Sequence, residues 1–436
     1  MIKLSDYSAY LAPVLGRSTD LVIERGSGSY IWDVQGRRYL DWVQGIAVNA
    51  LGHSHPRVVE AVTQQVAKIM TASFNLASYP PTLEWAQRLA QILPGDLGST
   101  FFSNGGAEAV DGAIKLARAA TGRPGIIAFK GAFHGRTMGA TSLTTSSSKY
   151  RKGYEPLVGG VDYSTYPSPD QCPAGCGPAE RSAYALEQLE ALFTYVRAPE
   201  TVAAVIIEPV QGEGGYVPAP AEFLQSLRAI TKAHGILLIC DEIQSGFGRT
   251  GKFLAVEHSG VVPDIVTLGK AMAGGLAASA IVSTPEIMSR WESGRHGSTF
   301  GGNPVVAAAG LAVLDEFEQS GIIENVNLQG DYLAGKLAQF QTRFPFITDS
   351  RGLGLMRAIE LNHPDGRPGS DLLTVLCRKA LEEGLLTLNC GVKGNGLRIS
   401  TPLNVTEDVL DEGLAILSLA LDHLASENLT LEPSFS

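Results

Sequence analysis

Short runs of consecutive apolar residues alternate with segments of helical spacing, and this alternation constrains the fold more than any other feature of the chain. Val202–Ile207 and Ile236–Cys240 are two such runs. Runs that are apolar at every position are typical of strands buried on both faces, as in parallel sheets. The helix predicted between them has an apolar face made of Phe223, Leu224, Leu227 and Ile230. The whole segment therefore predicts one β-α-β crossover.

Two more apolar runs, Ile126–Phe129 and Ile265–Leu268, extend this pattern. Helices alternate with short strands from about Arg57 onward, which indicates an α/β fold with a mostly parallel central sheet in a large domain. After about Val306, a long helical pattern leads into shorter strands and helices, which indicates a smaller α+β domain. We predict an N-terminal segment contributing to the small domain, a large domain and a C-terminal small domain, at residues 1–56, 57–310 and 311–436.

Composition and charge exclude several classes of protein. Hydrophobic residues make up 44% and charged residues 18% of the 436 positions, which excludes a disordered chain. The formal charge of −10 and the lack of any Lys/Arg block exclude nucleic acid or an anionic membrane as the main partner. No apolar stretch approaches the roughly 18–20 residues of a spanning helix. Five cysteines, an odd number with Cys240 inside an apolar run, indicate free thiols, and we expect a cytoplasmic enzyme of small molecules.

Polar residues follow three of the predicted strands directly or closely. Glu208 and Asp241 come after two of the runs, and Lys270 follows the third. Because ligands of parallel α/β sheets bind at the carboxyl ends of the strands, we expect these side chains to meet. Each of them alone could simply end a strand. Together, a lysine and carboxylates match the needs of pyridoxal 5′-phosphate, which forms a Schiff base with a lysine and requires an acid near its pyridine nitrogen.

A phosphate group needs a helix N-terminus with small residues, and the sequence offers one. Gly105, Gly106 and Ala107 lead directly into a helix whose apolar face is made of Val110, Ala113, Ile114 and Ala117. Backbone N–H groups at such a start bind anions. The alternative is an ordinary glycine-containing helix cap.

Two other kinds of site are weaker hypotheses. The segment 246–252 has the glycine and lysine spacing of a nucleotide-binding P-loop, but position 253 is Phe where the Mg²⁺-binding hydroxyl is required. His53 with His55, and Cys172 with Cys176, have metal-ligand spacing without a second ligand pair nearby. We assign no metal and no nucleotide.

Eight ordered blocks carry a specific resemblance that covers most of the chain. They read LDWVQGIAVNALGHSHP, SNGGAEAVDGAIKLAR, FHGRT, IIEPVQGEGGY, LLICDEIQSGFGRTG, LGKAMAGG, STFGGNP and GLRISTPL. In order and spacing they resemble the class-III pyridoxal-phosphate aminotransferases, most of all those acting on 4-aminobutyrate. The resemblance implies the aspartate-aminotransferase-like fold, known as fold type I, and the cofactor pyridoxal 5′-phosphate.

The resemblance also implies a role for each cofactor-binding residue. Lys270 resembles the Schiff-base lysine that moves the proton between substrate and cofactor, and Asp241 resembles the partner of the pyridine nitrogen. Gln244 resembles the partner of the ring hydroxyl, and Phe133 the residue stacked on the ring face, with His134 beside it.

Other blocks resemble the phosphate site of the family. Gly106 and Ala107 would offer backbone N–H groups to the phosphate. Thr299, with Ser298 next to it, resembles a phosphate ligand that the neighbouring subunit donates. The active unit is then a homodimer or a higher homo-oligomer. Gly105 stands where the family more often has Ser or Thr.

Substrate selection is expected from two arginines and a switch. Arg136 resembles the arginine for the distal carboxylate, and Arg398 the one for the α-carboxylate of glutamate or 2-oxoglutarate. Glu213 resembles the residue that pairs with Arg398 when no α-carboxylate is present. Ile46, an aliphatic residue where ornithine aminotransferases tend to have tyrosine, favours an ω-amino acid such as 4-aminobutyrate. Glu208 is placed in the substrate site as well.

Three alternatives stay open at this stage. Ornithine or acetylornithine are other donors, and some class-III relatives are amino-acid racemases or epimerases, which need no oxo-acid acceptor. The stretch 164–183, rich in Pro and Gly and containing two cysteines, matches no motif and predicts an irregular excursion near the substrate entrance.

Overall fold

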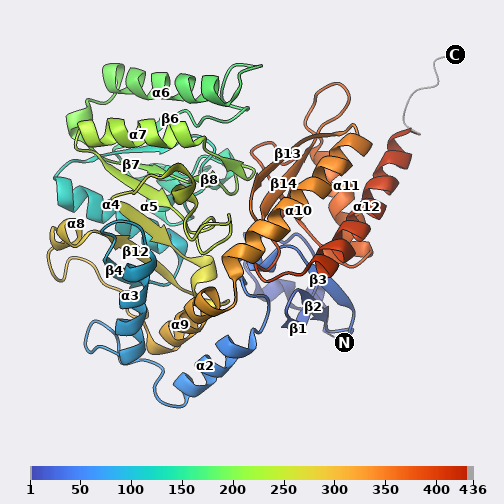
Figure 1. Cartoon of the computed structure of the whole chain (residues 1–436), viewed down its shortest axis with the longest axis horizontal. Helices are drawn as coiled ribbons and strands as arrows, with labels where there is room; N and C mark the ends of the chain where they lie inside the picture. The colour runs from blue at the N-terminus through green and yellow to red at the C-terminus, as the bar shows by residue number, and fades with distance from the viewer. Residues whose placement is uncertain (1, 430–436) are drawn as a thin grey trace.

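The computed structural model describes residues 2–429. A seven-stranded sheet forms the core of its larger part, which lies at the left in Figure 1. The order of the strands across the sheet is β4-β12-β11-β10-β7-β5-β6. Their bounds in that order are Ser99–Ser103, Ser279–Ser283, Ile265–Leu268, Leu237–Asp241, Val202–Ile207, Gly125–Phe129 and Val161–Ser164. The predicted α/β fold with a mostly parallel central sheet is confirmed.

Strand β12 is the one exception to the parallel arrangement of this sheet. It pairs antiparallel with β11 on one side and with β4 on the other. A parallel return from β11 would need a crossover of about a dozen residues or more. Only the segment 269–278 separates the two strands, and its one regular element is a 3₁₀ turn at Lys270–Ala273. The short connection therefore turns the chain back beside β11.

Helices cover both faces of the sheet and bury its apolar side chains. The helix α4, Gly106–Thr121, packs with the side chains of Ile126, Ile206 and Ile281 in one apolar cluster. The helices α6 and α7, Pro178–Tyr195 and Ala221–Ala233, contribute to the cluster on the opposite face. These layers fix the positions of the strand ends where the site lies.

Two smaller sheets lie beside this layered unit. The first is antiparallel, in the order β13-β14-β17-β16, and the second has the order β1-β2-β3-β15. Strands β13, β14, β16 and β17 span Ile347–Leu353, Met356–Leu361, Leu388–Cys390 and Gly396–Ile399. Strands β1, β2, β3 and β15 span Ile23–Ser27, Tyr30–Asp33, Arg38–Asp41 and Leu385–Leu386. Helices α10, α11 and α12 cover them, at Ile322–Arg343, Ser370–Glu382 and Glu407–Leu429.

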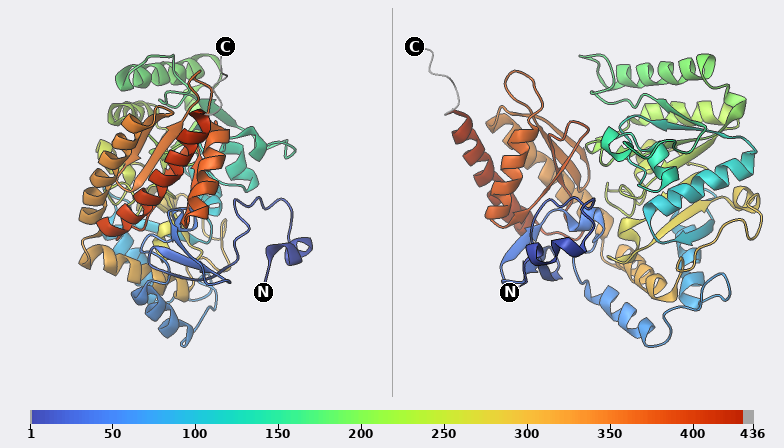
Figure 2. Two further views of the ribbon diagram at one scale, coloured as in Figure 1. Left: turned by 90° about the vertical axis from the view of Figure 1, so that its right-hand side faces the viewer. Right: turned by 180° about the vertical axis from the view of Figure 1, so that it is seen from behind.

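The N-terminal strands belong to the same part of the molecule as the C-terminal region. Strand β15 pairs in parallel with β3, with Leu385 opposite Leu40. Figure 2 shows the N-terminal strands lying against the C-terminal helices. This pairing supports the predicted contribution of residues 1–56 to a small domain, and we keep that division as a proposal. The predicted boundary at residue 310 lies inside the continuous helix α9, Pro304–Gln319.

Two further points concern single segments. The excursion predicted over residues 164–183 is irregular only as far as Gly177, because α6 begins at Pro178. There Pro fills the first helical position and Glu180 accepts the Gly177 N–H at 2.7 Å. None of the helices between residues 2 and 429 combines the length and the apolar character needed to cross a membrane.

Candidate active site

A cavity of about 180 Å³ lies at the carboxyl edge of the central sheet. Its wall is built by the segments that follow β4, β5, β7, β10 and β11. Eight of the fourteen residues predicted for the site line it: Gly106, Ala107, Phe133, His134, Glu208, Asp241, Gln244 and Lys270. The strand ends therefore converge as the sequence predicted.

Asp241 ends β10 and is held by three donors. The register pairs Asp241 with Thr267 of β11, and the Thr267 hydroxyl donates to Asp241 Oδ1 at 3.0 Å. The Ile243 N–H donates to the same oxygen at 3.2 Å. On the other oxygen, His134 Nδ1 lies 2.7 Å from Oδ2. The carboxylate is buried, and groups of the chain itself hold its orientation.

His134 is itself buried, and the pKa of its imidazole depends on Asp241. Burial alone lowers the pKa of His134, but the hydrogen bond and charge of Asp241 outweigh it, so the pKa is raised. The other ring nitrogen, Nε2, is buried and has no partner among the described residues. Among the described residues, the imidazole therefore makes its one side-chain hydrogen bond through Nδ1, to Asp241.

Lys270 follows β11 and carries an amine that loses its proton easily. Burial lowers the pKa of Lys270 to about 8, against which the charge of Glu213 acts in the opposite direction. A lysine amine is a nucleophile only when it is neutral. At a pKa of about 8 a usable fraction of the amine is neutral near physiological pH.

Glu208 directly follows β7 and connects two loops of the cavity wall. Its Oε1 accepts the N–H of Phe133 at 2.8 Å, and its Oε2 accepts the N–H of Gly212 at 2.9 Å. Burial raises the pKa of Glu208 to about 7. The side chain thus holds the aromatic residue and the start of the segment that carries Glu213.

The N-terminus of α4 offers two free backbone donors to the cavity. Glu108, inside the first turn, accepts the N–H groups of Asn104 at 2.9 Å and Gly105 at 3.3 Å. Within the described part of the chain, the N–H groups of Gly106 and Ala107 meet no acceptor. Donors of this kind at a helix start are suited to an anion such as phosphate.

Loop 133–136 approaches this helix start very closely. Gly135 has a φ of 128°, and a Cβ atom there would lie 2.4 Å from the Cβ of Ala107. Only glycine fits both the conformation and the contact. The loop can therefore bring Phe133 to the cavity beside the anion-binding donors.

Gln244 and Tyr216 connect the cavity to a buried ion pair. The Tyr216 hydroxyl donates to Gln244 Oε1 at 3.0 Å, and the guanidinium of Arg398 lies 5.9 Å from the Tyr216 ring centre. Arg398, from β17, donates to both carboxylate oxygens of Glu213 at 2.7 and 2.8 Å. Its side chain is only 3% exposed.

This ion pair governs the charge of Glu213. Burial raises the pKa of Glu213, but the charge of Arg398 outweighs burial and the pKa is lowered. The pKa of Arg398 is raised by the same carboxylate against the effect of burial. Both groups are therefore ionised, and removing either one would leave a charge in a largely dry place.

The other six predicted residues are not part of the cavity wall of their own chain. Two of them, Glu213 and Arg398, form the ion pair described above, and the remaining four lie elsewhere. Ile46 is 42% exposed, and Arg136 is exposed and stacks on Tyr150, with 4.6 Å between guanidinium and ring centre. The Ser298 hydroxyl lies 3.0 Å from Asn104 Nδ2, close to the start of α4. The side chain of Thr299 is exposed.

The sequence interpretation missed four residues of the cavity wall. They are Gly135, Val210, Ile243 and Ser245. Each lies inside a recognised block, one or two positions from a predicted residue. Selection by polar chemistry overlooked Val210 and Ile243, which are apolar, and Gly135, which has no side chain. Ser245 is polar, but its hydroxyl donates to the neighbouring carboxylate of Glu242.

Known proteins share this arrangement over nearly the whole chain. A 5-aminovalerate aminotransferase of Pseudomonas aeruginosa is 41% identical over 94% of this chain and 96% of its own length. A 4-aminobutyrate aminotransferase of Escherichia coli is 40% identical over 94% and 95%. The crystal structure of an amine transaminase from an uncultivated Pseudomonas species, in its pyridoxal-phosphate-bound form, superimposes with a TM-score of 0.88 at 30% identity, covering 95% and 98% of the two chains.

The family profile described as aminotransferase class-III matches residues 13–421. Lys270, the held carboxylate of Asp241 and the donors at the start of α4 agree with the pyridoxal-phosphate chemistry of that family. The chain belongs to the class-III aminotransferases, and its cofactor is pyridoxal 5′-phosphate.

Proposed function

We propose that this aminotransferase moves the amino group of an ω-amino acid, with 4-aminobutyrate favoured, to 2-oxoglutarate. The observation that carries the proposal is the buried ion pair between Arg398 and Glu213. An arginine with an internal carboxylate partner can serve one substrate that brings an α-carboxylate and another that lacks it. The names of two relatives, for 5-aminovalerate and 4-aminobutyrate, support the same donor class.

The residues of the cavity fit pyridoxal phosphate. The unpaired N–H groups of Gly106 and Ala107 would bind its phosphate, and the carboxylate of Asp241 would hold its ring nitrogen. Gln244 would face the ring hydroxyl, and Phe133 the ring face. When bound, this cofactor supplies an electron sink for the negative charge that develops on the amino-bearing carbon.

Lys270 would form the Schiff base with the cofactor and then act as an acid and base. Once the amino group of the substrate has displaced it from the cofactor, its free amine, with a pKa of about 8, would take the proton from the amino-bearing carbon at Nζ and would pass it to a carbon of the cofactor. His134 keeps Asp241 oriented throughout through the Nδ1 contact at 2.7 Å.

The two arginines would divide the substrates between them. Arg136 would take the distal carboxylate, and Arg398 the α-carboxylate of glutamate or 2-oxoglutarate. Glu213 would stay on Arg398 while an ω-amino acid reacts and would turn away when glutamate enters. Glu208 would support both steps through the loops that its carboxylate joins.

We further propose a homodimer or higher homo-oligomer in the cytoplasm. Four apolar side chains of the segments 69–76 and 298–300 are exposed, with exposed fractions of 41%, 61%, 84% and 60% for Ile69, Met70, Leu76 and Phe300. We propose that they form one apolar patch. The two loops of the patch are joined by Asn75 Nδ2, which donates to the Ser298 carbonyl at 3.1 Å. A second copy on this patch would bring its Thr299 toward the phosphate site.

The proposal is tested by the visible absorbance of the bound cofactor. We expect 4-aminobutyrate alone to bleach the absorbance band and 2-oxoglutarate to restore it, because each half-reaction changes the cofactor. The same titration with 5-aminovalerate, ornithine and acetylornithine ranks the donors. Loss of chirality from a single-enantiomer amino acid without any oxo-acid would instead identify a racemase. No response to any ω-amino acid would refute the proposed donor class.

A further inference from the structure

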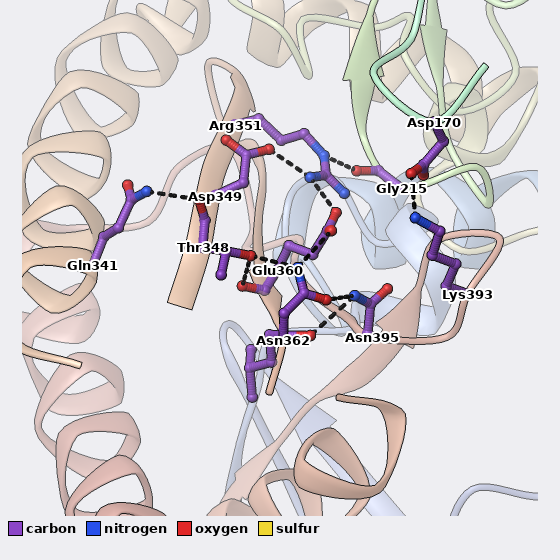
Figure 3. Close-up of polar contacts among 11 residues, drawn as sticks. Asp170, Gly215, Gln341, Thr348, Asp349, Arg351, Glu360, Asn362, Lys393 and Asn395 are labelled. Carbon is purple, nitrogen blue, oxygen red and sulfur yellow. Dashed lines mark hydrogen bonds and ion pairs between the residues drawn. The ribbon is translucent and has the colours of Figure 1, made fainter. Parts of the chain in front are cut away.

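Arg351 joins the C-terminal sheet to the segment that carries Glu213 (Figure 3). The arginine lies in β13, and its Nε donates to the carbonyl oxygen of Gly215 at 2.7 Å. Its Nη1 donates to Asp349 at 2.6 Å and to Glu360 at 2.7 Å. The side chain is 15% exposed. The guanidinium is thus held by two carboxylates of its own sheet while it reaches across to the other part of the molecule.

The segment around Glu213 is held at a second point by the same part of the molecule. The N–H of Gly391, in the turn between β16 and β17, donates to the Glu213 carbonyl oxygen at 2.9 Å. The two bonds hold the backbone at positions 213 and 215. The side chain of Glu213 meanwhile pairs with Arg398 from β17 of that sheet.

Gly215 shows how closely Arg351 approaches this backbone. Its φ is 121°, and a Cβ atom there would lie 2.9 Å from Arg351 Nη2. A side chain at this position would displace the guanidinium and would also strain the backbone. The contact is therefore built into the conformation of the segment.

We propose that Arg351 is a positioning residue for Glu213. The carboxylate of Glu213 and the α-carboxylate of the substrate would alternate as partners of Arg398, which we call the exchange. By fixing the backbone at Gly215, Arg351 confines the exchange to a rotation of the Glu213 side chain. Glu213 can then leave Arg398 for glutamate and return to it for an ω-amino acid. This inference rests on the proposed function. Arg351 acts through Glu213 and touches neither substrate nor cofactor.

Arg351→Lys and Arg351→Met test the proposal. Lysine keeps the charge between the two carboxylates, but its single nitrogen cannot take the two separate places of Nε and Nη1. Methionine keeps an unbranched stem without charge. We expect both variants to lower kcat/KM for the ω-amino acid half-reaction by at least about tenfold relative to the glutamate half-reaction. The reason is that a displaced Glu213 leaves Arg398 unpaired only when the substrate has no α-carboxylate.

Arg357→Met is the matched control. Arg357 lies on the adjacent strand β14 and donates to the carbonyls of Gly354 at 3.0 Å and Gly352 at 2.9 Å, within the same hairpin. Arg357 thus supports the hairpin. Within the described part of the chain, it makes no hydrogen bond to the segment that carries Glu213. We expect its ratio of the two half-reactions to stay within about twofold of the wild-type ratio.

A double variant separates positioning from general support of the fold. In a Glu213→Gln background, Arg351→Lys should leave the ratio of the half-reactions unchanged, since the two residues act through one interaction. An unchanged ratio in the single Arg351 variants would overturn the inference. So would a shift that persists in the Glu213→Gln background. Failure of the proposed function can be told apart from failure of this inference. In the first case the wild-type enzyme itself would show no reaction with the ω-amino acid.

Discussion

At the scale of single residues, Lys270 combines an unusual backbone with an unusual amine. Its φ of 45° lies in the left-handed region, which for a residue other than glycine costs of order 1 kcal/mol or more. The strain follows from the short return between β11 and β12 and points the lysine into the cavity. Burial at that place lowers the pKa of the amine to about 8.

The low pKa predicts how the cofactor-free enzyme recovers pyridoxal phosphate. Because only the neutral amine attacks an aldehyde, the rate of rebinding should rise with pH and show a midpoint near 8, the folded-state pKa. Stopped-flow absorbance measures this rate, and Lys270→Ala is the control that forms no Schiff base. A midpoint near the ordinary lysine value of 10.5 would contradict the assignment.

The pKa of Glu208 is raised rather than lowered, and it gives a prediction about stability. Its folded-state pKa of about 7 lies above the ordinary value of 4.5, so the folded protein holds a proton that the unfolded chain releases. Stability contributed by this group is therefore lost as pH rises from 4.5 to 7, by up to about 3 kcal/mol. In Glu208→Gln this loss is absent.

The measurement is Tm as a function of pH in both proteins. Glu208→Gln also loses one of two accepted N–H bonds, so it should be less stable than the wild type near pH 5. The gap in Tm should narrow between about pH 5 and 8. A gap that stays constant would show that Glu208 does not titrate in this range.

At the scale of elements, the start of α4 is the feature that we propose for the phosphate of the cofactor. The helix is capped from inside by Glu108, which leaves the donors of Gly106 and Ala107 for a phosphate. Helix α6 has the same kind of cap, where Glu180 accepts the Gly177 N–H, far along the chain from any cavity residue. The two caps form a natural pair for comparison.

Replacing each capping glutamate by alanine should separate stability from binding. Both Glu108→Ala and Glu180→Ala should cost about 1 kcal/mol of stability, because each leaves a helix start with an unsatisfied N–H group. Only Glu108→Ala should weaken the binding of pyridoxal phosphate, by about threefold to tenfold, since only that helix start lies at the proposed phosphate site. Equal affinity in the two variants would exclude α4 as the phosphate site.

The elements also show what the sequence could and could not predict. Val202–Ile207 and Ile265–Leu268 are strands with the predicted bounds. Both runs are short and rich in β-branched residues, which favours a strand of a buried sheet over a buried helix. Strand β12, Ser279–Ser283, was not predicted. Its terminal serines interrupt the apolar pattern, and its direction follows from a short connection.

The residues of the candidate site also fall into those that could be placed from the sequence and those that could not. Residues at strand ends, such as Asp241 and Lys270, could be placed from the sequence because the sheet fixes them. Arg136 lies on a loop, and Ile46 lies in the short element α1, Gln44–Ala47, where its backbone is left-handed rather than helical. Both side chains are exposed. Arg351 was overlooked because its partner is a backbone carbonyl, which leaves no signature in a sequence.

At the scale of the whole molecule, an assembly with shared sites has a testable consequence. Thr299 is exposed on its own chain, whereas Lys270 belongs to the cavity of that chain. If each site takes Thr299 from the partner subunit, two defective chains can complement each other. In a mixed dimer, one site receives both defects and the other receives none.

Co-expression of Lys270→Ala with Thr299→Asp tests this arrangement. Each variant alone should be nearly inactive, the first without the amine and the second with a negative charge facing the phosphate. Random pairing should restore about a quarter of the wild-type activity, because half of the dimers are mixed and each has one intact site. Absence of any recovery in isolated mixed dimers would show that Thr299 serves its own chain.

The parallel pairing of β15 with β3 also sets an order of events during synthesis. Leu385 lies 345 positions after its partner Leu40, so translation at about 5–20 residues per second separates the two strands by roughly 20 to 70 seconds. Until then, the hairpin strands β1 to β3 have an open edge while the central sheet already has all its strands. The first sheet to leave the ribosome is therefore among the last to be completed.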